Sequence, residues 1–341
     1  MAQPLTMETE CLELRTRHPF IIARGGRSEY RTIWVRLRDA EGHEGWGEAT
    51  PSSFYGETAE TVRAALDRYA GALPADAFDI EETERRWEAS LRINASARAA
   101  LSGALHDLVG KRLGVPLYRL WGLDPAKAPR STFTIGLDTP ERIRLKVEEA
   151  AEYPILKIKL GTDRDVEILR TIREATDKEI RVDANCGWTV KQAVAMLPVL
   201  QEFGVTVLEQ PLPPDQIAGL AELSRRATIP VVADESCRTA VDIPPLVGAV
   251  DGINIKLGKC GSLREALRMI AVARAHGLMV MVGCMIESSL GITAAAHFTP
   301  LVDIVDLDGA ALLASDPFVG ATIAGGQVAL PAGPGLGVRT R

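Results

Sequence analysis

The chain has 341 residues, of which 46% are hydrophobic and 25% are charged, and this composition excludes a disordered or fibrous protein. A formal net charge of −6 gives no basic field for a phosphate backbone, so we expect no nucleic-acid partner. No apolar run approaches the roughly 20 residues of a membrane-spanning helix, and the N-terminal residues lack the pattern of a secretory signal. We therefore expect no membrane partner, and five cysteines without CxxC spacing favour a reducing cytoplasm.

Residues 1–125 are predicted to form an α+β domain. Apolar and polar residues alternate in short runs over residues 11–51, and the sequence DAEG at 39–42 is typical of a turn between strands. Apolar residues at helical spacing follow from Glu57 to Leu113, where Gly114 and Pro116 end the pattern. The length of the chain leaves room for such a domain beside a barrel of about 250 residues.

Residues 126–315 are predicted to form a (β/α)8 (TIM) barrel, because short apolar runs alternate with helical patterns at a nearly constant spacing. Helix starts are expected at Thr139, Thr189 and Ser262. Residues 316–341 contain no further repeat and are expected to return to the N-terminal domain. The eight expected strands are Ser131–Thr134, Ile155–Lys159, Ile180–Asp183, Val207–Glu209, Val231–Asp234, Ile253–Lys256, Met279–Val282 and Ile304–Asp306.

Charged residues end most of these strands, and the carboxyl ends of barrel strands meet at one face, where active sites lie. Because side chains alternate along a strand, aliphatic residues that face the helices turn their neighbours towards the barrel axis. For any one charged residue, an ion pair or a solvated strand end is the plainer interpretation. Their recurrence indicates a site, whose inward members include Lys157, Lys159, Asp183, Asn185, Glu209, Asp234, Lys256, Asp306 and Asp308.

Three carboxylates, Asp183, Glu209 and Asp234, end consecutive strands. Crowded like charges raise pKa values or recruit a cation, and an all-oxygen set without His or Cys favours Mg²⁺. The alternative is that they pair with neighbouring lysines. Lys159 and Lys256 lie four strands apart in eight, so they are expected to approach the axis from opposite sides. A carbon held between them could lose a proton from one face and regain it on the other.

These motifs resemble the enolase superfamily, in particular its muconate-lactonizing subgroup. The resemblance rests on KxK at 157–159, DxN at 183–185, LEQP around Glu209, ADES around Asp234 and NIKLGK around Lys256. It implies a barrel with a capping domain, Mg²⁺ on the three carboxylates, two acid–base lysines, and Asn185 and Glu235 beside the metal ligands. Ser262 replaces a glycine that is usual in the family.

Within that subgroup, Asp306-Leu307-Asp308 is similar to the DxD motif with which dipeptide epimerases hold the substrate's α-ammonium. The resemblance therefore implies an isomerase of cell-wall peptide metabolism that epimerises L-Ala-D/L-Glu. Lys157 would bind the substrate carboxylate. An unpaired carboxylate couple at 306 and 308 is expected to take its cation from the substrate.

Side-chain specificity is expected to depend on the loop of Arg24 and Arg27, either of which could pair with a glutamate side chain. A surface ion pair is the alternative for both. Further candidates for the substrate pocket are Phe54, Tyr55, Thr134, Cys284 and Met285.

Two other functions stay open from the sequence. One is a different reaction of the same scaffold, by a cycloisomerase or an o-succinylbenzoate synthase, and the DxD motif disfavours it. The other is a non-catalytic, metal-dependent peptide-binding protein, which would not need two opposed lysines. A homo-oligomer is also left open.

Overall fold

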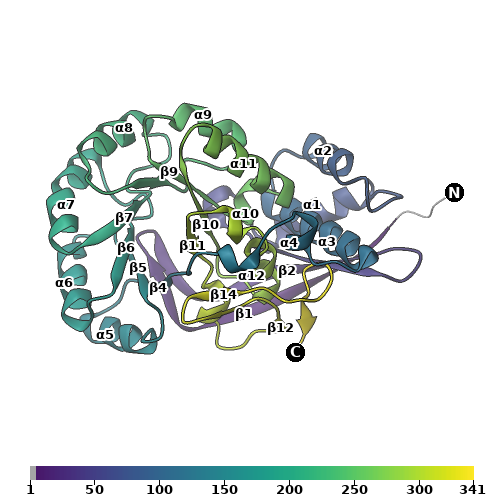
Figure 1. Ribbon diagram of the computed structural model, residues 1–341, viewed down its shortest axis with the longest axis horizontal. Coiled ribbons are helices and arrows are strands. Elements are labelled where there is room, and N and C mark those ends of the chain that lie inside the picture. The colour runs from purple at the N-terminus through teal and green to yellow at the C-terminus, as the bar shows by residue number, and fades with distance from the viewer. Residues whose placement is uncertain (1–4) are drawn as a thin grey trace.

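The computed structural model describes residues 5–341, which build a β/α barrel with an α+β domain beside it (Figure 1). The eight parallel barrel strands follow one another in chain order, and a parallel bridge between Ser131 and Val305 closes the ring, so the predicted barrel is confirmed. The first strand begins at Phe133 because Ser131 makes only the closing bridge. The strands are β4 (Phe133–Ile135), β5 (Ile155–Lys159), β6 (Glu179–Asp183), β7 (Val205–Glu209), β8 (Val231–Ala233), β9 (Gly252–Ile255), β10 (Met279–Gly283) and β11 (Ile304–Asp306).

Helices surround the outside of the ring (Figure 1). Some of them begin at a side-chain cap that satisfies a free backbone N–H group: Thr189 accepts from Gln192 N, and Ser262 accepts from Glu265 N. Thr139 also precedes a helix, as expected, but its side chain makes no such cap. Each such cap is worth about 1 kcal/mol. The helices that follow strands are α5 (Pro140–Glu149), α6 (Asp165–Ala175), α7 (Val190–Glu202), α8 (Ile217–Arg226), α9 (Ile243–Leu246), α10 (Leu257–Cys260), α11 (Leu263–Ala275) and α12 (Ser289–Ala296).

Aliphatic strand residues pack under these helices and decide which side chains face the axis. Ile158, Val182 and Leu208 are fully buried in the barrel core. Because successive side chains point to opposite faces of a strand, their neighbours Lys157, Lys159 and other charged residues turn inward.

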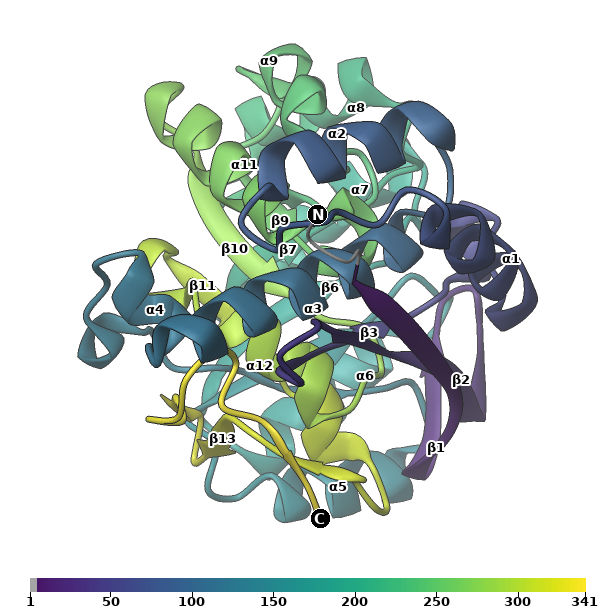
Figure 2. The ribbon, with the colours of Figure 1, turned by 90° about the vertical axis from the view of Figure 1, so that its right-hand side faces the viewer.

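The N-terminal domain is an antiparallel sheet covered by helices, and its strands are labelled at the right of Figure 2. Its strands are β1 (Thr6–Ile22), β2 (Gly25–Arg38) and β3 (Glu44–Ala49), and the predicted turn at 39–42 joins β2 to β3. Its helices are α1 (Ala59–Ala70), α2 (Ile80–Ser90), α3 (Ala95–Leu113) and α4 (Leu117–Leu120).

Short 3-10 turns occur in both parts of the molecule. They are η1 (Ser53–Tyr55), η2 (Pro125–Lys127), η3 (Ala240–Asp242), η4 (Thr299–Leu301) and η5 (Gly309–Leu312).

Helix α3 lies between this sheet and the barrel and is buried almost all round. It contacts β3 closely because Gly45 and Gly47 carry no side chain there; a Cβ at either position would collide with the backbone carbonyls of Ala104 or Ala100. The helix therefore couples the two cores of the chain.

The C-terminal residues run along both parts of the molecule, through β12 (Phe318–Val319), β13 (Thr322–Ala324), β14 (Gln327–Ala329) and β15 (Arg339–Thr340). The ring of Phe318 packs edge-on against Trp34 of β2, with centroids 5.0 Å apart, and Leu117 N donates to Gly335 O. The domain boundaries at residues 125 and 315 stay a prediction.

Over residues 5–341, none of the helices has the length and apolar character needed to cross a membrane.

Candidate active site

A cavity of about 300 Å³ opens at the carboxyl ends of the barrel strands. The barrel supplies its floor, and two segments of the N-terminal domain, the β1–β2 hairpin and residues 50–55, supply its cover. Most of the predicted site residues line it, while Asp183 and Glu209 lie beneath, almost fully buried. The lining includes Arg24, Tyr55, Thr134, Lys157, Lys159, Asn185, Asp234, Glu235, Lys256, Cys284, Met285, Asp306 and Asp308.

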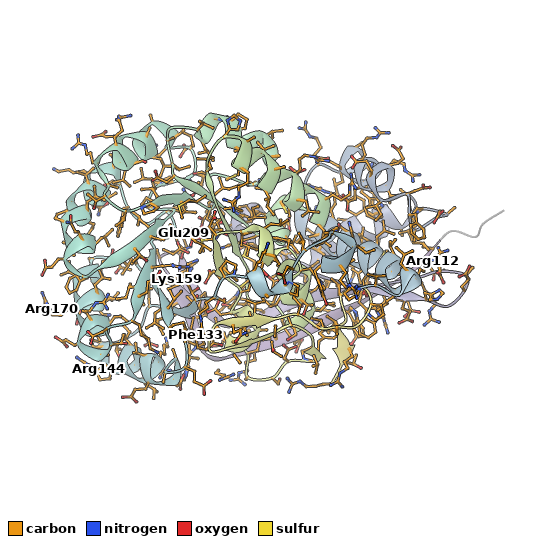
Figure 3. The ribbon with its side chains drawn as sticks, viewed as in Figure 1. Arg112, Phe133, Arg144, Lys159, Arg170 and Glu209 are labelled. Atoms are coloured by element: carbon orange, nitrogen blue, oxygen red, sulfur yellow. The ribbon has the colours of Figure 1, made fainter. Side chains whose placement is uncertain are left out.

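Asp183, Glu209 and Asp234 converge as the sequence predicts. They come from the ends of β6, β7 and β8, and one carboxylate oxygen of each lies within 4.8 Å of the others. Glu209 and Lys159 lie inside the ring in Figure 3, whereas Arg144 and Arg170 lie on its outer helices.

These carboxylates fit a hard divalent cation. All donors are oxygens, and three of them at this separation leave positions for other ligands. Two further buried oxygens at the centre, Asn185 Oδ1 and Glu235 Oε2, have no hydrogen-bond partner among residues 5–341. Buried polar atoms normally have partners, so the centre is suited to an additional ligand.

The three carboxyl groups differ in their pKa values. Burial alone would raise the pKa of Asp183, but Lys159 and Lys157 outweigh it and lower that pKa to about 2. Burial and the charge of Asp183 raise the pKa of Glu209 to about 7. Two lysines keep the pKa of Asp234 well below its usual value despite burial. The crowding of like charge that the sequence predicts is therefore present.

Lysines reach the triad from both sides of the barrel. Lys159 Nζ lies 2.6 Å from Asp183 Oδ2, and Lys256 Nζ lies 2.8 Å from Asp234 Oδ2. One lysine comes from β5 and the other follows β9, four strands away around the ring. Burial lowers the pKa of Lys256, but the charges of Asp234 and Glu209 outweigh burial and raise this pKa above the usual value for a lysine. The carboxylates of the triad therefore converge and are also paired with neighbouring lysines.

Lys157 lies at the centre of the cluster, with its Nζ 2.6 Å from Glu209 Oε2 and 2.7 Å from Asp306 Oδ2. The expectation that residues 306 and 308 lack a cation within the chain was therefore wrong, because Lys157 already pairs with Asp306. Thr132 Oγ1 also donates to Asp306.

Asp308 is the member of the pair that has no lysine within 4.0 Å among residues 5–341. Its Oδ2 accepts from Thr134 N at 2.5 Å. Burial and the neighbouring Asp306 raise its pKa to about 7. An incoming ammonium group would therefore find its strongest unmatched acceptor at Asp308.

The two arginines of the hairpin differ in their partners. Arg24 Nη1 lies 2.8 Å from Glu235 Oε1, donates to Asn185 O, and its guanidinium lies over the ring of Phe54. Arg27 stacks on Tyr30 at 4.5 Å and lines the cavity, without a carboxylate within 4.0 Å among the described residues. Arg24 thus connects the hairpin to the barrel through its ion pair and hydrogen bond. The charge of Arg27 is available to a ligand.

The remaining wall candidates are apolar or neutral. Phe54 and Tyr55 pack edge to face at 5.1 Å. Burial raises the pKa of the Cys284 thiol well above its usual range, so this cysteine is a packing residue of the wall. Met285 lies beside it and lines the same cavity.

Four residues that hold the site in place were not assigned from the sequence. Asn254 Nδ2 donates to Glu209 Oε1, Gln210 Oε1 accepts from Asp234 N, and Thr132 holds Asp306 as described. Lys259 contacts Asp234 from behind. The inward position of Asn254 and the second lysine of NIKLGK were visible in the sequence, but their partners depend on tertiary distances.

The closed barrel, its strand-end carboxylates and lysines, and the α+β domain over its mouth define a capped barrel of the enolase type. The chain belongs to the mandelate racemase/muconate lactonizing enzyme family: the N-terminal domain model of that family matches residues 6–122, and the enolase C-terminal domain-like model matches residues 141–341.

Named relatives cover almost the whole chain. The L-Ala-D/L-Glu epimerase of Bacteroides thetaiotaomicron is 43% identical over 96% of this chain and 85% of its own length. The dipeptide epimerase of Enterococcus faecalis, solved with Mg and L-Leu-L-Tyr, superposes with a TM-score of 0.94 at 31% identity, covering 99% of this chain and 100% of that one. The substrate-liganded L-Ala-D/L-Glu epimerase of Bacillus subtilis gives the same TM-score and identity, with 99% of each chain covered.

Proposed function

We propose that this protein is a Mg²⁺-dependent dipeptide epimerase that inverts the α-carbon of the C-terminal residue, with L-Ala-D/L-Glu as its substrate. The observation that carries the proposal is the placement of Lys159 and Lys256 on opposite sides of one acidic cluster. A binding protein needs no such pair, whereas proton removal from one face and return to the other needs both lysines.

The lysines divide the reaction by face. Lys159 as the neutral amine takes the α-proton of one epimer, while Lys256 as the ammonium group gives a proton to the opposite face; for the other epimer Lys256 is the neutral amine and Lys159 the ammonium group. Asp183, Glu209 and Asp234 would hold Mg²⁺, which would supply positive charge beside the substrate carboxylate where negative charge develops as the α-proton leaves. Lys157 adds a second positive charge at the substrate's carboxylate. Asn185 and Glu235 lie beside the metal ligands Asp183 and Asp234 and support them.

Asp306 ends the last strand and Asp308 follows it, and both are assigned to the N-terminal ammonium group, although Asp306 Oδ2 is also paired with Lys157. Thr134 fixes Asp308 through its backbone N–H, which leaves the other oxygen for the substrate. The relatives support a dipeptide because two of them were solved with a substrate bound in this fold.

Arg27 is assigned to the glutamate side chain. The relatives include proteins named for glutamate and one solved with a tyrosyl dipeptide, so the side-chain pocket varies within the family. Here the cavity contains an arginine, Arg27, that has no carboxylate partner in the described part of the chain, which fits an acidic side chain. The proposal also includes a cytoplasmic location, in which the five free cysteines stay reduced, and leaves a homo-oligomer open.

The direct test is incubation of the Mg²⁺-loaded protein with L-Ala-L-Glu in D2O. We expect formation of L-Ala-D-Glu with one deuterium at the glutamyl α-carbon. Binding without deuterium uptake would indicate a peptide-binding protein instead. Turnover of a succinyl-cyclohexadiene carboxylate alone would assign the protein to the synthases.

Arg27→Met is expected to lower kcat/KM for L-Ala-L-Glu about 10- to 100-fold, the loss that accompanies one charged hydrogen bond of roughly 1.5–3 kcal/mol. The rate on L-Ala-L-Met should change little. Arg24→Met is the matched control: it should lower both rates together, because Arg24 latches the hairpin. Equal loss on both dipeptides from Arg27→Met would contradict the assignment.

N-acetylation of the dipeptide is expected to lower kcat/KM by a similar factor, about 10- to 100-fold, because the neutral amide brings no charge to Asp308. Asp308→Asn should erase most of this discrimination by slowing the free dipeptide. Parent protein that converts free and acetylated L-Ala-L-Glu at equal rates would remove Asp306 and Asp308 from substrate binding.

A further inference from the structure

Lys259 is a fully buried lysine that the proposed reaction does not use. It lies on the one-turn helix α10, three residues after Lys256, and its side chain is 0% exposed. It does not line the active-site cavity. Its ammonium group therefore reaches neither solvent nor substrate and must serve residues inside the protein.

Four oxygens surround the Lys259 ammonium group. Nζ lies 2.5 Å from Asp234 Oδ1, 2.6 Å from Asp234 O, 2.8 Å from Asn254 O and 3.0 Å from Cys237 O. These oxygens belong to the end of β8, the loop that follows it, and β9. A buried charge is costly unless it is paired and hydrogen-bonded, and this site satisfies both conditions.

The contacts divide the two oxygens of Asp234 between two lysines. Oδ1 faces Lys259 behind the site, and Oδ2 faces Lys256 at the cavity. Lys256 exchanges its proton with the substrate in the proposed reaction, so its contact with Asp234 cannot be permanent. Lys259 has no access to the substrate, and its contact can persist through the cycle.

Resting on the proposed function, we propose that Lys259 is a positioning residue for Mg²⁺ binding: it holds Asp234 Oδ1 and the adjoining carbonyls so that Oδ2 stays directed at the metal position. Groups that orient metal ligands typically contribute about 10- to 100-fold to metal affinity. Lys259 thus belongs to the metal site, although it is neither a ligand nor an acid–base group.

The test is calorimetric titration of Mg²⁺ into parent protein and Lys259→Met. We expect the variant to raise the Kd for Mg²⁺ about 10- to 100-fold. Excess Mg²⁺ should restore a large part of kcat, because the defect lies in metal occupancy. A role confined to folding would lower Tm and leave the Kd of the folded fraction unchanged.

Lys146→Met is the matched control. Lys146 is also a buried lysine, and its Nζ pairs with Asp138 Oδ2 at 2.8 Å on α5, outside the cavity. Its loss removes a comparable ion pair, so it should lower Tm without changing the Kd for Mg²⁺. A similar loss of affinity in Lys146→Met would show that the titration reports stability only.

Lys259→Arg covers the case in which Lys259→Met does not fold. The charge is kept, but a planar guanidinium cannot place one nitrogen among four acceptors, so we expect a several-fold rise in Kd. A Kd within about twofold of parent in either folded variant would overturn the proposal, since orienting groups contribute far more than that. Failure of the parent itself to bind Mg²⁺ would instead refute the proposed function.

Discussion

Lys159→Ala and Lys256→Ala are each expected to abolish epimerisation while each still exchanges the α-proton of one epimer with solvent. The structure holds the two side chains on opposite sides of the acidic cluster, so each serves one face of the α-carbon. Loss of one acid–base group typically costs about 10²–10⁴ in rate, and inversion needs both.

The measurement is deuterium exchange in D2O, followed by NMR for L-Ala-L-Glu and L-Ala-D-Glu separately. Lys159→Ala should label one epimer and Lys256→Ala the other, so each variant is the control for the folding of its counterpart. If either variant interconverted the epimers at the parent rate, a one-base mechanism would replace the two-base mechanism.

Asp183→Asn, Glu209→Gln and Asp234→Asn are each expected to lower kcat by about 10³-fold or more, because the metal supplies several kcal/mol of transition-state stabilisation and each carboxylate holds it. Chelation of the parent by EDTA should have the same effect, and added Mg²⁺ should reverse it. Full activity after chelation would exclude a metal requirement.

Asp165→Asn controls for the loss of a buried carboxylate. Asp165 is 3% exposed and accepts hydrogen bonds from Gly161 N, Thr162 N and Trp188 Nε1, outside the triad. Its replacement should lower Tm but leave the Kd for Mg²⁺ near the parent value. Calorimetry on all four variants separates a lost ligand from a lost structural contact.

The barrel and the triad could be predicted because both depend on local periodicity. Strands with aliphatic residues on one face necessarily direct the residues between them to the axis, and parallel strands bring their ends to one side. The positions of Asp183, Glu209 and Asp234 follow from this geometry without knowledge of distances.

The partners of individual side chains could not be predicted in the same way. Lys157 and Lys159 occupy the same face of β5 and both contact Asp183 on the next strand, but Lys157 also pairs with Asp306, two strands away in the other direction around the ring. Which carboxylates each lysine reaches depends on the position of its side chain along the barrel axis. Arg24 and Arg27 likewise lie on one hairpin, and the sequence does not indicate that Arg24, and not Arg27, forms the ion pair with Glu235.

The bridge between Ser131 and Val305 joins the first barrel strand to the last, and it has a consequence for ligand-dependent folding. Thr132 and Thr134 on one side of this seam hold Asp306 and Asp308 on the other, across 174 residues of sequence. The carboxylates assigned to the ammonium group are therefore positioned only when the ring is closed. A dipeptide that binds these carboxylates favours the closed ring over any opened form by its own binding free energy. The substrate is therefore expected to stabilise the folded barrel.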